Sequence, residues 1–379
     1  TQTSRDSNHN IGVQWLQDLR HALEKSYENL KDFSGKVNVL KSRIETLFYD
    51  MDFGCLYDNS RELFSIGYDI ENERLTNSYY DLLASEARQA SFIAIGKGDV
   101  PKRHWSKMGR ALTVIDNKKV LLSWSGTMFE YLMPLLIMKN YEYTLFSETY
   151  RGVVRGQIEY GKQRRTPWGV SESGYNGFDR HLNYQYRAFG VPNLGLKRGL
   201  ADDIVIAPYA TVLALQVDRV SAMQNIYRLI EEGLDGEYGL FEAIDYTTSR
   251  LPRGKKSVII ESFMAHHQGM SLMSIANLLY DNVMQRRFHS QPIVQSTNLL
   301  LQERIPVREI YLKDFIEPVM PVYRTTKAYA DKVRRFNSPN TQIPQIQILS
   351  NANFSTVITN SGGGFIRYGD TAISRWRQD

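Results

Sequence analysis

A carboxyl group flanked by aromatic residues lies in a segment rich in residues that interrupt helices and strands. Glu172 belongs to the stretch 165–176, which also contains Trp168, Tyr175, two glycines and a proline. Aromatic rings stack on the apolar faces of pyranose rings, and a carboxyl sheltered beside an indole can hold a proton at neutral pH. We therefore expect a sugar-binding loop, with neither helix nor strand running through it. The alternative is an ordinary connecting loop in which Trp168 caps the core.

A second candidate carboxyl is Glu261, which follows the apolar run 258–260 and precedes Ser262. At such a junction between loop and helix, nearby N–H groups can hold a carboxylate. Glycoside chemistry needs two carboxyls, one protonated and one ionised, so Glu172 and Glu261 form the preferred pair. The alternatives are an acid on a surface loop for Glu172 and an acid at a helix N-terminus for Glu261. Other acids kept as candidates are Asp52, Asp58, Asp81, Glu86, Glu130, Asp202 and Asp203.

The remaining residues that often bind metals or cofactors do not have the required spacing. His266 and His267 are adjacent, and neighbouring side chains on a helix point about 100° apart. The His-Glu-x-x-His spacing of zinc enzymes is missing, so we predict substrate binding or packing, and no metal. The single cysteine, Cys55, excludes an internal disulfide and a zinc site with several cysteines, and we expect it to be buried. The turn 361–364 lacks the Lys-Ser/Thr of a phosphate-binding loop, so no nucleotide cofactor is expected.

The composition is that of a globular protein with a sizeable core. The chain has 379 residues, 42% of them hydrophobic, and a formal net charge of +5. Its basic clusters are short and lack regularly interleaved aromatics, which argues against a nucleic-acid-binding protein. No run approaches the ~18 apolar residues of a membrane span, so we expect this segment to be soluble. The use of one cysteine favours a reducing compartment.

Apolar residues recur with a helical period over most of the chain. The pattern predicts residues 1–10 disordered, two helices over 11–47 that break at 32–35, and a small hairpin over 51–68. Further helical stripes cover 83–94, 129–136, 220–230 and 272–279, and Pro208 is placed to begin a helix. Helices joined by loops with Trp, Gly and acids predict an all-α array whose loops meet on one face. From about residue 343 the period becomes that of strands, in a set too small to form a stable domain alone, so we expect a longer polypeptide.

Four blocks of sequence carry a family resemblance. Residues 57–68, 78–88, 168–173 and 261–270 together resemble the glucoamylase-like domain of cyclic β-1,2-glucan synthases. The tail, 349–376, resembles the first strands of the phosphorylase-type domain that follows it in those proteins. The resemblance implies an (α/α)6 barrel over residues 49–320. Residues 1–48 would be a helical linker, and 321–379 a linker with the first strands of a β-sandwich.

The resemblance also implies a function for this domain. In that family a membrane-bound glycosyltransferase extends a linear β-1,2-glucan, and the glucoamylase-like domain cleaves the chain and rejoins it into a ring. This segment would then be a retaining transglycosylase without a cofactor, held at the cytoplasmic side of a bacterial inner membrane by neighbouring domains. Glu261 would be the nucleophile and Glu172 the acid/base. Residues that would shape the sugar subsites are Trp168, Tyr175, Asp58, His266, His267 and Gln268.

Two other functions remain open from the sequence. Related (α/α)6 proteins hydrolyse the same polymer, so an inverting endo-β-1,2-glucanase is one alternative. The other is a glucan-binding module without catalytic activity, which passes substrate to the phosphorylase-type domain. The number of residues between Glu172 and Glu261 does not decide which carboxyl takes which role.

Overall fold

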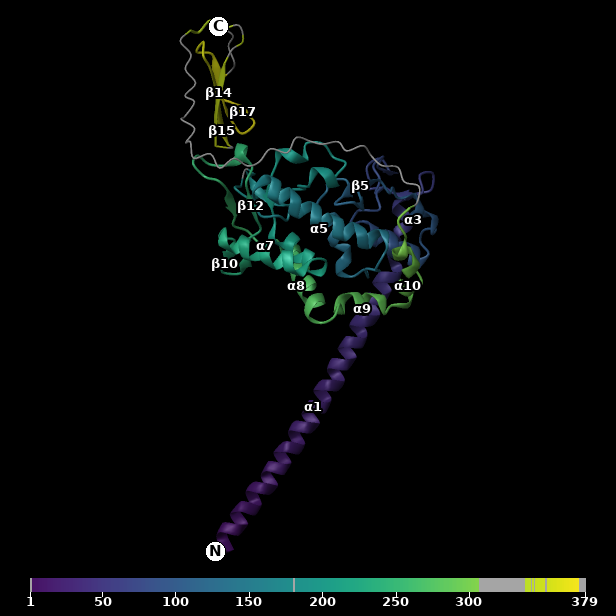
Figure 1. Ribbon diagram of the computed structural model, residues 1–379. Coiled ribbons are helices and arrows are strands. Elements are labelled where there is room, and N and C mark those ends of the chain that lie inside the picture. The colour runs from purple at the N-terminus through teal and green to yellow at the C-terminus, as the bar shows by residue number, and fades with distance from the viewer. Residues whose placement is uncertain are drawn as a thin grey trace.

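The computed structural model describes residues 2–179, 181–306, 338–341, 343, 345–351 and 353–374, with side chains from residue 12 onward. Figure 1 shows a main body, a long helix that projects from it, and a C-terminal sheet. The helices are α1 (Gln2–Asp50), α2 (Arg88–Lys97), α3 (Arg103–Lys107), α4 (Met128–Leu132), α5 (Leu145–Arg164), α6 (Pro208–Leu213), α7 (Arg219–Glu231), α8 (Ala265–Leu279), α9 (Val283–His289) and α10 (Pro292–Gln295).

Helix α1 is continuous, so two predictions for the N-terminal region are wrong. Residues 2–10 are part of this helix, whereas they were expected to be disordered, and no break occurs at 32–35. The expected break depended largely on Gly35, and one glycine costs a helix only about 1 kcal/mol relative to alanine. That cost does not end a helix that has helix-favouring residues on both sides. Only the C-terminal part of α1, called its base below, meets the body (Figure 1).

Short antiparallel strands lie between the helices, so the body is mixed and not purely helical as predicted. Most are two-stranded hairpins, and one three-stranded sheet has the order β13-β12-β9. The predicted hairpin over 51–68 is confirmed as β1 and β2. The strands of the body are β1 (Tyr57–Asp58), β2 (Leu63–Phe64), β3 (Tyr68–Asp69), β4 (Arg74–Leu75), β5 (Leu112–Ile115), β6 (Lys118–Leu121), β7 (Ser173–Phe178), β8 (Tyr184–Arg187), β9 (Val205–Ile206), β10 (Asp235–Gly236), β11 (Gly239–Leu240), β12 (Ala243–Asp245) and β13 (Val258–Ile260).

Helix α5 runs through the middle of the body and organises its core (Figure 1). It begins at Thr144, whose side chain accepts a hydrogen bond from the Ser147 N–H, and ends at Arg165 in the left-handed conformation. Gly152 allows α5 to approach β6 closely, because a Cβ atom there would lie 2.2 Å from a methyl group of Val120. The fully buried Val153, on the same helix, belongs to the hydrophobic core. This packing fixes the helix whose C-terminal end leads into the loop with Glu172.

The C-terminal segment is a four-stranded antiparallel sheet in chain order, which confirms the predicted β-structure there. A turn with Gly362 at φ 94° connects two of its strands and matches the expected glycine turn. The predicted domain boundary at 320/321 lies outside the described residues. The strands of the sheet are β14 (Ile346–Ser350), β15 (Phe354–Thr359), β16 (Gly364–Tyr368) and β17 (Thr371–Ala372).

Candidate active site

A cavity of about 530 Å³ opens in the body, and its wall is rich in acidic and aromatic side chains. The segment 78–86 forms one side of it and the loop that ends at Glu172 contributes to another. Trp124, which is 59% exposed, offers a flat ring at its edge. The acids of the lining are Asp81, Glu86, Glu130 and Glu172. A polar-aromatic cleft with several carboxyls fits a carbohydrate better than an apolar ligand.

The loop before Glu172 is held by hydrogen bonds from the surrounding helices. Gln157 on α5 donates to the Val170 carbonyl (2.7 Å) and accepts from the Val170 N–H (2.8 Å). The Tyr209 hydroxyl on α6 lies 2.8 Å from Ser171 Oγ and donates to the Glu172 carbonyl (3.0 Å). Because Gln157 and Tyr209 are buried, these bonds fix the backbone of the loop. No helix or named strand runs through the whole stretch 165–176, although β7 begins within it at Ser173.

Glu172 has the electrostatic environment of a general acid. Burial, together with the nearby Glu86 and Glu130 carboxyls, raises the pKa of Glu172 to about 7, although a hydrogen bond with the Tyr186 hydroxyl opposes the rise. An acid with a pKa near the working pH can donate a proton and take it back. The raised pKa predicted from the loop composition therefore has a physical cause in the structure, although that cause is burial with neighbouring acids and not an adjacent indole.

A chain of polar groups leads away from Glu172 into the core. Behind the Tyr186 hydroxyl lies the buried His267, whose Nε2 is 3.2 Å from that hydroxyl. The other ring nitrogen, Nδ1, is 3.0 Å from Oε2 of the buried Glu242. The Glu242 carboxylate thus accepts from Nδ1–H, which leaves Nε2 as an acceptor. The Tyr186 hydroxyl has one proton, so it donates to Nε2 or to the Glu172 carboxylate, and not to both at once. The Tyr209 ring stacks on His267 with centroids 3.7 Å apart and holds the imidazole in place.

Glu242 is itself fixed by a backbone contact, because its Oε1 accepts from the Gly174 N–H at 3.1 Å. Both of its oxygens are therefore bonded within the protein, and its side chain is buried. It therefore orients His267 and is not among the described residues that line the cavity. His266, next in sequence, is exposed, with its Nε2 3.4 Å from the Tyr186 hydroxyl. Partial desolvation of the ring and the neighbouring His267 lower the pKa of His266, so it is neutral near pH 7 and can accept or donate one hydrogen bond.

Two of the other candidate acids mainly support the local backbone. Glu130 forms a capping box with Thr127 at the start of α4, and its carboxylate also accepts from Ser123 Oγ (2.7 Å) and the Ser125 N–H (3.0 Å). Asp58 accepts from the Ser60 hydroxyl (2.6 Å) and from the Tyr79 hydroxyl (2.7 Å). These bonds hold the pKa of Asp58 well below its usual range. Asp58 thus orients Tyr79, a residue of the cavity wall.

Glu261 is exposed and lies directly after β13. The described lining of the cavity does not include it. The chain nevertheless brings it toward Glu172, because the side chain of Ile260 packs beside Gly174, where a Cβ atom would lie 3.3 Å from it. Glu172 precedes this contact by two residues and Glu261 follows it by one. Glu172 and Glu261 therefore lie at the ends of two strands in contact, Glu172 directly before β7 and Glu261 directly after β13.

The aromatic residues of the predicted loop are packed more deeply than expected. Trp168 is 6% exposed and belongs to the hydrophobic core, as in the alternative that it caps the core. Tyr175 is partly buried, with its ring 4.9 Å from the Arg250 guanidinium and its edge against Phe189. Gln268 donates to the Leu240 carbonyl at 3.4 Å. Cys55 is exposed, so its predicted burial is wrong: it lies in a short 3-10 turn on the surface and donates to the Asp52 carbonyl.

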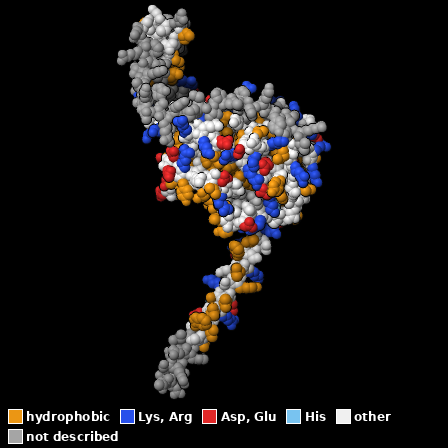
Figure 2. All heavy atoms as spheres, viewed as in Figure 1, with side chains coloured by type: hydrophobic (Ala, Val, Ile, Leu, Met, Phe, Trp, Pro, Cys, Tyr) orange, Lys and Arg blue, Asp and Glu red, His pale blue; other side chains and the backbone are white. Residues whose placement is uncertain are grey.

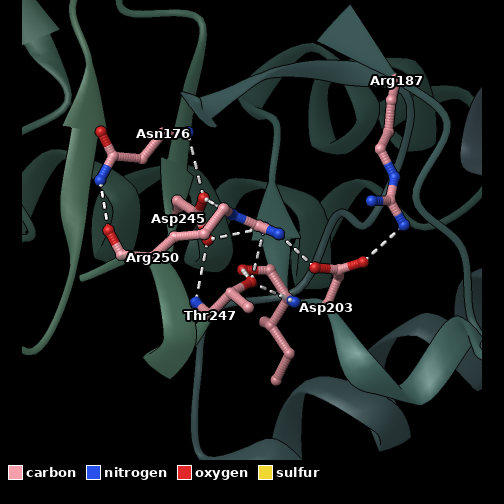
Figure 3. Close-up of polar contacts among 7 residues, drawn as sticks. Asn176, Arg187, Asp203, Asp245, Thr247 and Arg250 are labelled. Atoms are coloured by element: carbon pink, nitrogen blue, oxygen red, sulfur yellow. Dashed lines mark hydrogen bonds and ion pairs between the residues drawn. The ribbon is translucent and has the colours of Figure 1, made fainter. Parts of the chain in front are cut away.

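Arg250 connects the strands around the site through a network of charged groups (Figure 3). Its guanidinium contacts both oxygens of the fully buried Asp245, at 2.8 and 3.1 Å. It also pairs with Asp203, which in turn accepts from Arg187 at 2.6 Å. Asn176 in β7 donates its N–H to Asp245 and its side-chain amide to the Arg250 carbonyl (Figure 3). The network therefore ties β7, β8 and β12 together.

The sequence interpretation missed Trp124, Tyr186 and Glu242. Trp124 stands in Ser-Trp-Ser-Gly, a composition close to that of the loop with Glu172, so the same criterion could have found it. Tyr186 is one of 23 tyrosines, and Glu242 has no distinctive neighbours in sequence. Their roles come from contacts between segments more than 60 residues apart for Tyr186 and His267, and 25 apart for Glu242 and His267.

Among the described residues, His, Cys, Asp and Glu side chains form no group of three or more that could hold a metal ion. Within the same residues, no helix has both the length and the apolar character needed to cross a membrane.

Comparison with known proteins identifies the family. A family model described as "Putative glucoamylase" matches residues 78–292, more than half of the chain. The chain belongs to this family. A second model, the supersandwich domain of glycosyl hydrolase 94, matches residues 330–379. The predicted resemblance to a glucoamylase-like domain followed by the start of a phosphorylase-type domain is thus confirmed.

One curated relative is similar along most of this family member. Over 349 residues the chain is 42% identical to the cyclic beta-(1,2)-glucan synthase NdvB of Rhizobium meliloti (strain 1021). The match covers 90% of this chain and 12% of that protein, so the chain spans about one eighth of the relative's length.

Solved structures share the fold of this family member. An endo-beta-1,2-glucanase from Chitinophaga pinensis, in complex with sophorotriose and glucose, has a TM-score of 0.52 at 19% identity, covering 70% of this chain and 65% of that one. A putative glucoamylase from Bacteroides fragilis NCTC 9343 has a TM-score of 0.50 at 19% identity, covering 70% and 64%. The chain therefore spans slightly less than two thirds of each. These likenesses show a glucoamylase-like fold.

Proposed function

We propose that this chain processes β-1,2-glucan by retaining transglycosylation, cleaving a linear chain and rejoining it into a ring. The observation that carries the proposal is Glu172, a carboxyl at a polar-aromatic cavity with its pKa raised to about 7. The similarity to a cyclic β-1,2-glucan synthase and to a β-1,2-glucanase supports the choice of polymer. In this proposal residues 49–320 form an (α/α)6 barrel, preceded by a linker over 1–48. Residues 321–379 lead into a phosphorylase-type domain.

In the first chemical step, Glu172 donates its proton to the oxygen of the breaking glycosidic bond. Glu261 attacks the anomeric carbon and forms a covalent glycosyl-enzyme. The hydroxyl at the far end of the same glucan then displaces Glu261, and Glu172 takes the proton back. Two inversions restore the β configuration, and the energy of the linkage is kept in the covalent intermediate. A sugar hydroxyl can relay the proton, so the distance between the two carboxyls need not match that of direct transfer.

The subsites are proposed from the exposed groups around the cavity. Trp124 offers a stacking surface, and His266 lies beside Glu172's partner Tyr186. Tyr175, His267 and Gln268 act from behind this layer, because each is engaged with other protein groups. Trp168, 6% exposed, supports the loop from the core side. Larger partners remain those expected for the family: a glycosyltransferase domain and a phosphorylase-type domain, at the cytoplasmic side of a bacterial inner membrane.

The test uses linear β-1,2-glucan and mass spectrometry of the products. Ring closure gives products lighter than the linear chains by one water. Glu172→Gln and Glu261→Gln preserve volume and remove only the acid, so we expect turnover to fall by at least about 1000-fold in each. Glu159→Gln on the outer face of α5 is the matched control and should keep full activity. Full activity in both active-site variants would refute the proposal and favour a binding module.

The alternative is an inverting hydrolase, and the fold shared with an endo-β-1,2-glucanase supports this alternative. In that case a carboxylate holds a water molecule opposite the leaving group, and α-anomeric products appear first in an NMR time course. In a glucan complex the retaining enzyme instead has a Glu261 oxygen about 3–3.5 Å from the anomeric carbon, with no ordered water between them.

A further inference from the structure

Helix α1 exposes a continuous apolar seam with a heptad repeat. Nine of its ten core positions are apolar, which is the spacing of a two-helix interface. These nine side chains are exposed, from 40% for Leu19 to 68% for Leu47. With Leu16 as position a, the a positions are Leu16, Leu23, Leu30, Val37 and Ile44, and the d positions are Leu19, Ser26, Phe33, Leu40 and Leu47. Helices in water gain most of their stability by burying such a face, and α1 buries it against nothing along most of its length (Figures 1 and 2).

The seam continues into a groove at the base of α1. The groove has a volume of about 770 Å³, and its α1 wall contains three successive core positions, Val37, Leu40 and Ile44. The opposite wall belongs to the body and comes from α2, α9 and α10. Its apolar residues are Phe92, Ile93, Phe288, Pro292, Ile293 and Val294. A helix lying on the seam would therefore have its end enclosed between α1 and the body.

The charges beside the seam indicate the chemistry of that helix. Positions e and g flank the core of a helix pair and face the partner. From residue 15 to 48, each charged residue at these positions is basic: Arg20, Lys36, Lys41 and Arg43. The acids of the same segment lie at b, c and f, and three of them form exposed ion pairs within the helix with the basic residues: Glu24 with Arg20, Asp32 with Lys36, and Glu45 with Lys41. Such exposed pairs contribute little to stability, so an acidic partner helix can compete for these basic side chains. The acids of this segment are Asp18, Glu24, Glu28, Asp32 and Glu45.

This arrangement argues against a second copy of the chain. In a parallel pair, position g of one helix faces position e of the next heptad on the other, so Lys36 would face Lys41. In an antiparallel pair, g faces g and e faces e, which again brings basic side chains together. An anionic membrane surface would satisfy the basic side chains, but it would not fill a groove with a protein wall on its far side.

We propose that the seam and groove bind one amphipathic helix whose core positions are apolar and whose e and g positions carry Asp or Glu. The apolar side chains would supply the affinity, and the acids would select the partner by pairing with the four basic residues.

The test measures binding of designed helical peptides to the full chain. One labelled peptide has four heptads with Leu at a and d and Glu at e and g. The matched peptide has Lys at e and g. We expect the Glu peptide to bind at least about tenfold more tightly by fluorescence anisotropy, with an affinity that falls as salt is raised. Equal binding of the two peptides, or no binding of either, would overturn the proposal.

Variants of exposed residues separate the apolar and the charged contributions. Leu23→Asp with Leu30→Asp should abolish binding, whereas Glu28→Gln on the outer face is the matched control and should change nothing. Lys36→Glu, Lys41→Glu and Arg43→Glu together should reverse the preference toward the Lys peptide. Two other results would contradict the proposal. One is a stable dimer of the chain in sedimentation, lost in the Leu23→Asp and Leu30→Asp variant. The other is binding to phosphatidylserine vesicles without binding to either peptide.

Discussion

At the scale of single residues, the ionisation of Glu172 controls the proposed chemistry. Its pKa is raised to about 7 by burial and by the carboxyls of Glu86 and Glu130. The glycosidic oxygen can take a proton only from the protonated acid. We therefore expect kcat/KM to fall about tenfold per pH unit above pH 7, measured on linear β-1,2-glucan between pH 5 and 9. A profile that stays flat up to pH 9 would exclude Glu172 as the acid.

The same pKa predicts an effect on stability that does not require substrate. The ordinary pKa of the Glu172 carboxyl is 4.5, and folding raises it to about 7, so the folded state holds a proton that the unfolded state releases. The destabilisation is absent below pH 4.5, grows as the pH rises to 7, and is constant above that. Glu172→Gln cannot ionise and should raise Tm more at pH 8 than at pH 5. Equal changes in Tm at both pH values would contradict the raised pKa, with Glu159→Gln as the exposed control.

At the scale of elements, Arg250 stabilises the strands that carry the site. Its side chain is 16% exposed and pairs with Asp245, which is 0% exposed, and with Asp203, which is 12% exposed. Arg250→Met would leave these acids with an uncompensated charge, so we expect a loss of about 3–5 kcal/mol in the free energy of unfolding. Urea denaturation measures this loss.

Arg187 provides the matched control for Arg250, because it pairs with the same Asp203. Its side chain is 45% exposed, and ion pairs near the surface contribute about 0–1 kcal/mol. Arg187→Met should therefore lower the free energy of unfolding by no more than about 1 kcal/mol. Similar losses for the two arginines would show that the network is solvated and does not hold the strands.

Helices α7 and α8 show which part of an element a sequence can specify. Apolar stripes over 220–230 and 272–279 predicted both helices, and both are confirmed. The stripes nevertheless face outward, since Val220 is 67% and Leu272 is 68% exposed. The period of a stripe gives the type of element, because it depends only on local geometry. The side that is buried depends on what packs against it, and local sequence does not specify that partner.

For the candidate site too, local sequence identifies one part and contacts between distant segments determine the other. The loop with Glu172 was identified from its own residues, because breakers, aromatics and an acid occur together within it. The support from Tyr186, His267 and Glu242 depends on contacts between distant segments, which no spacing along the chain reveals. Trp168 shows the limit of composition, since the same aromatic residue type can face a sugar or the core. In the core its backbone N–H and carbonyl are both bonded by Asn225, a residue 57 positions away that the loop composition does not reveal.

At the scale of the whole molecule, α1 should be the first part to yield to a protease. Its basic residues are exposed and it lacks packing along most of its length (Figure 2), whereas α5 crosses the core. We expect limited trypsin digestion to cut at Lys25, Lys31 and Lys36 well before it cuts within α5, as followed by mass spectrometry. The trimmed product should keep the thermal unfolding transition of the body. Equal rates of cleavage in α1 and α5 would show that α1 is packed in solution.

The exposed cysteine also makes the molecule convenient for spectroscopy. Cys55 is the one cysteine of the sequence and lies on the surface five residues after the end of α1. A maleimide dye will attach there with one dye per chain, without any engineered substitution. Trp15 on α1 is 62% exposed, but it is one of five tryptophans, so its fluorescence does not report on this helix alone. A single dye at the point where α1 joins the body therefore reports on the mobility of this junction without any change to the sequence.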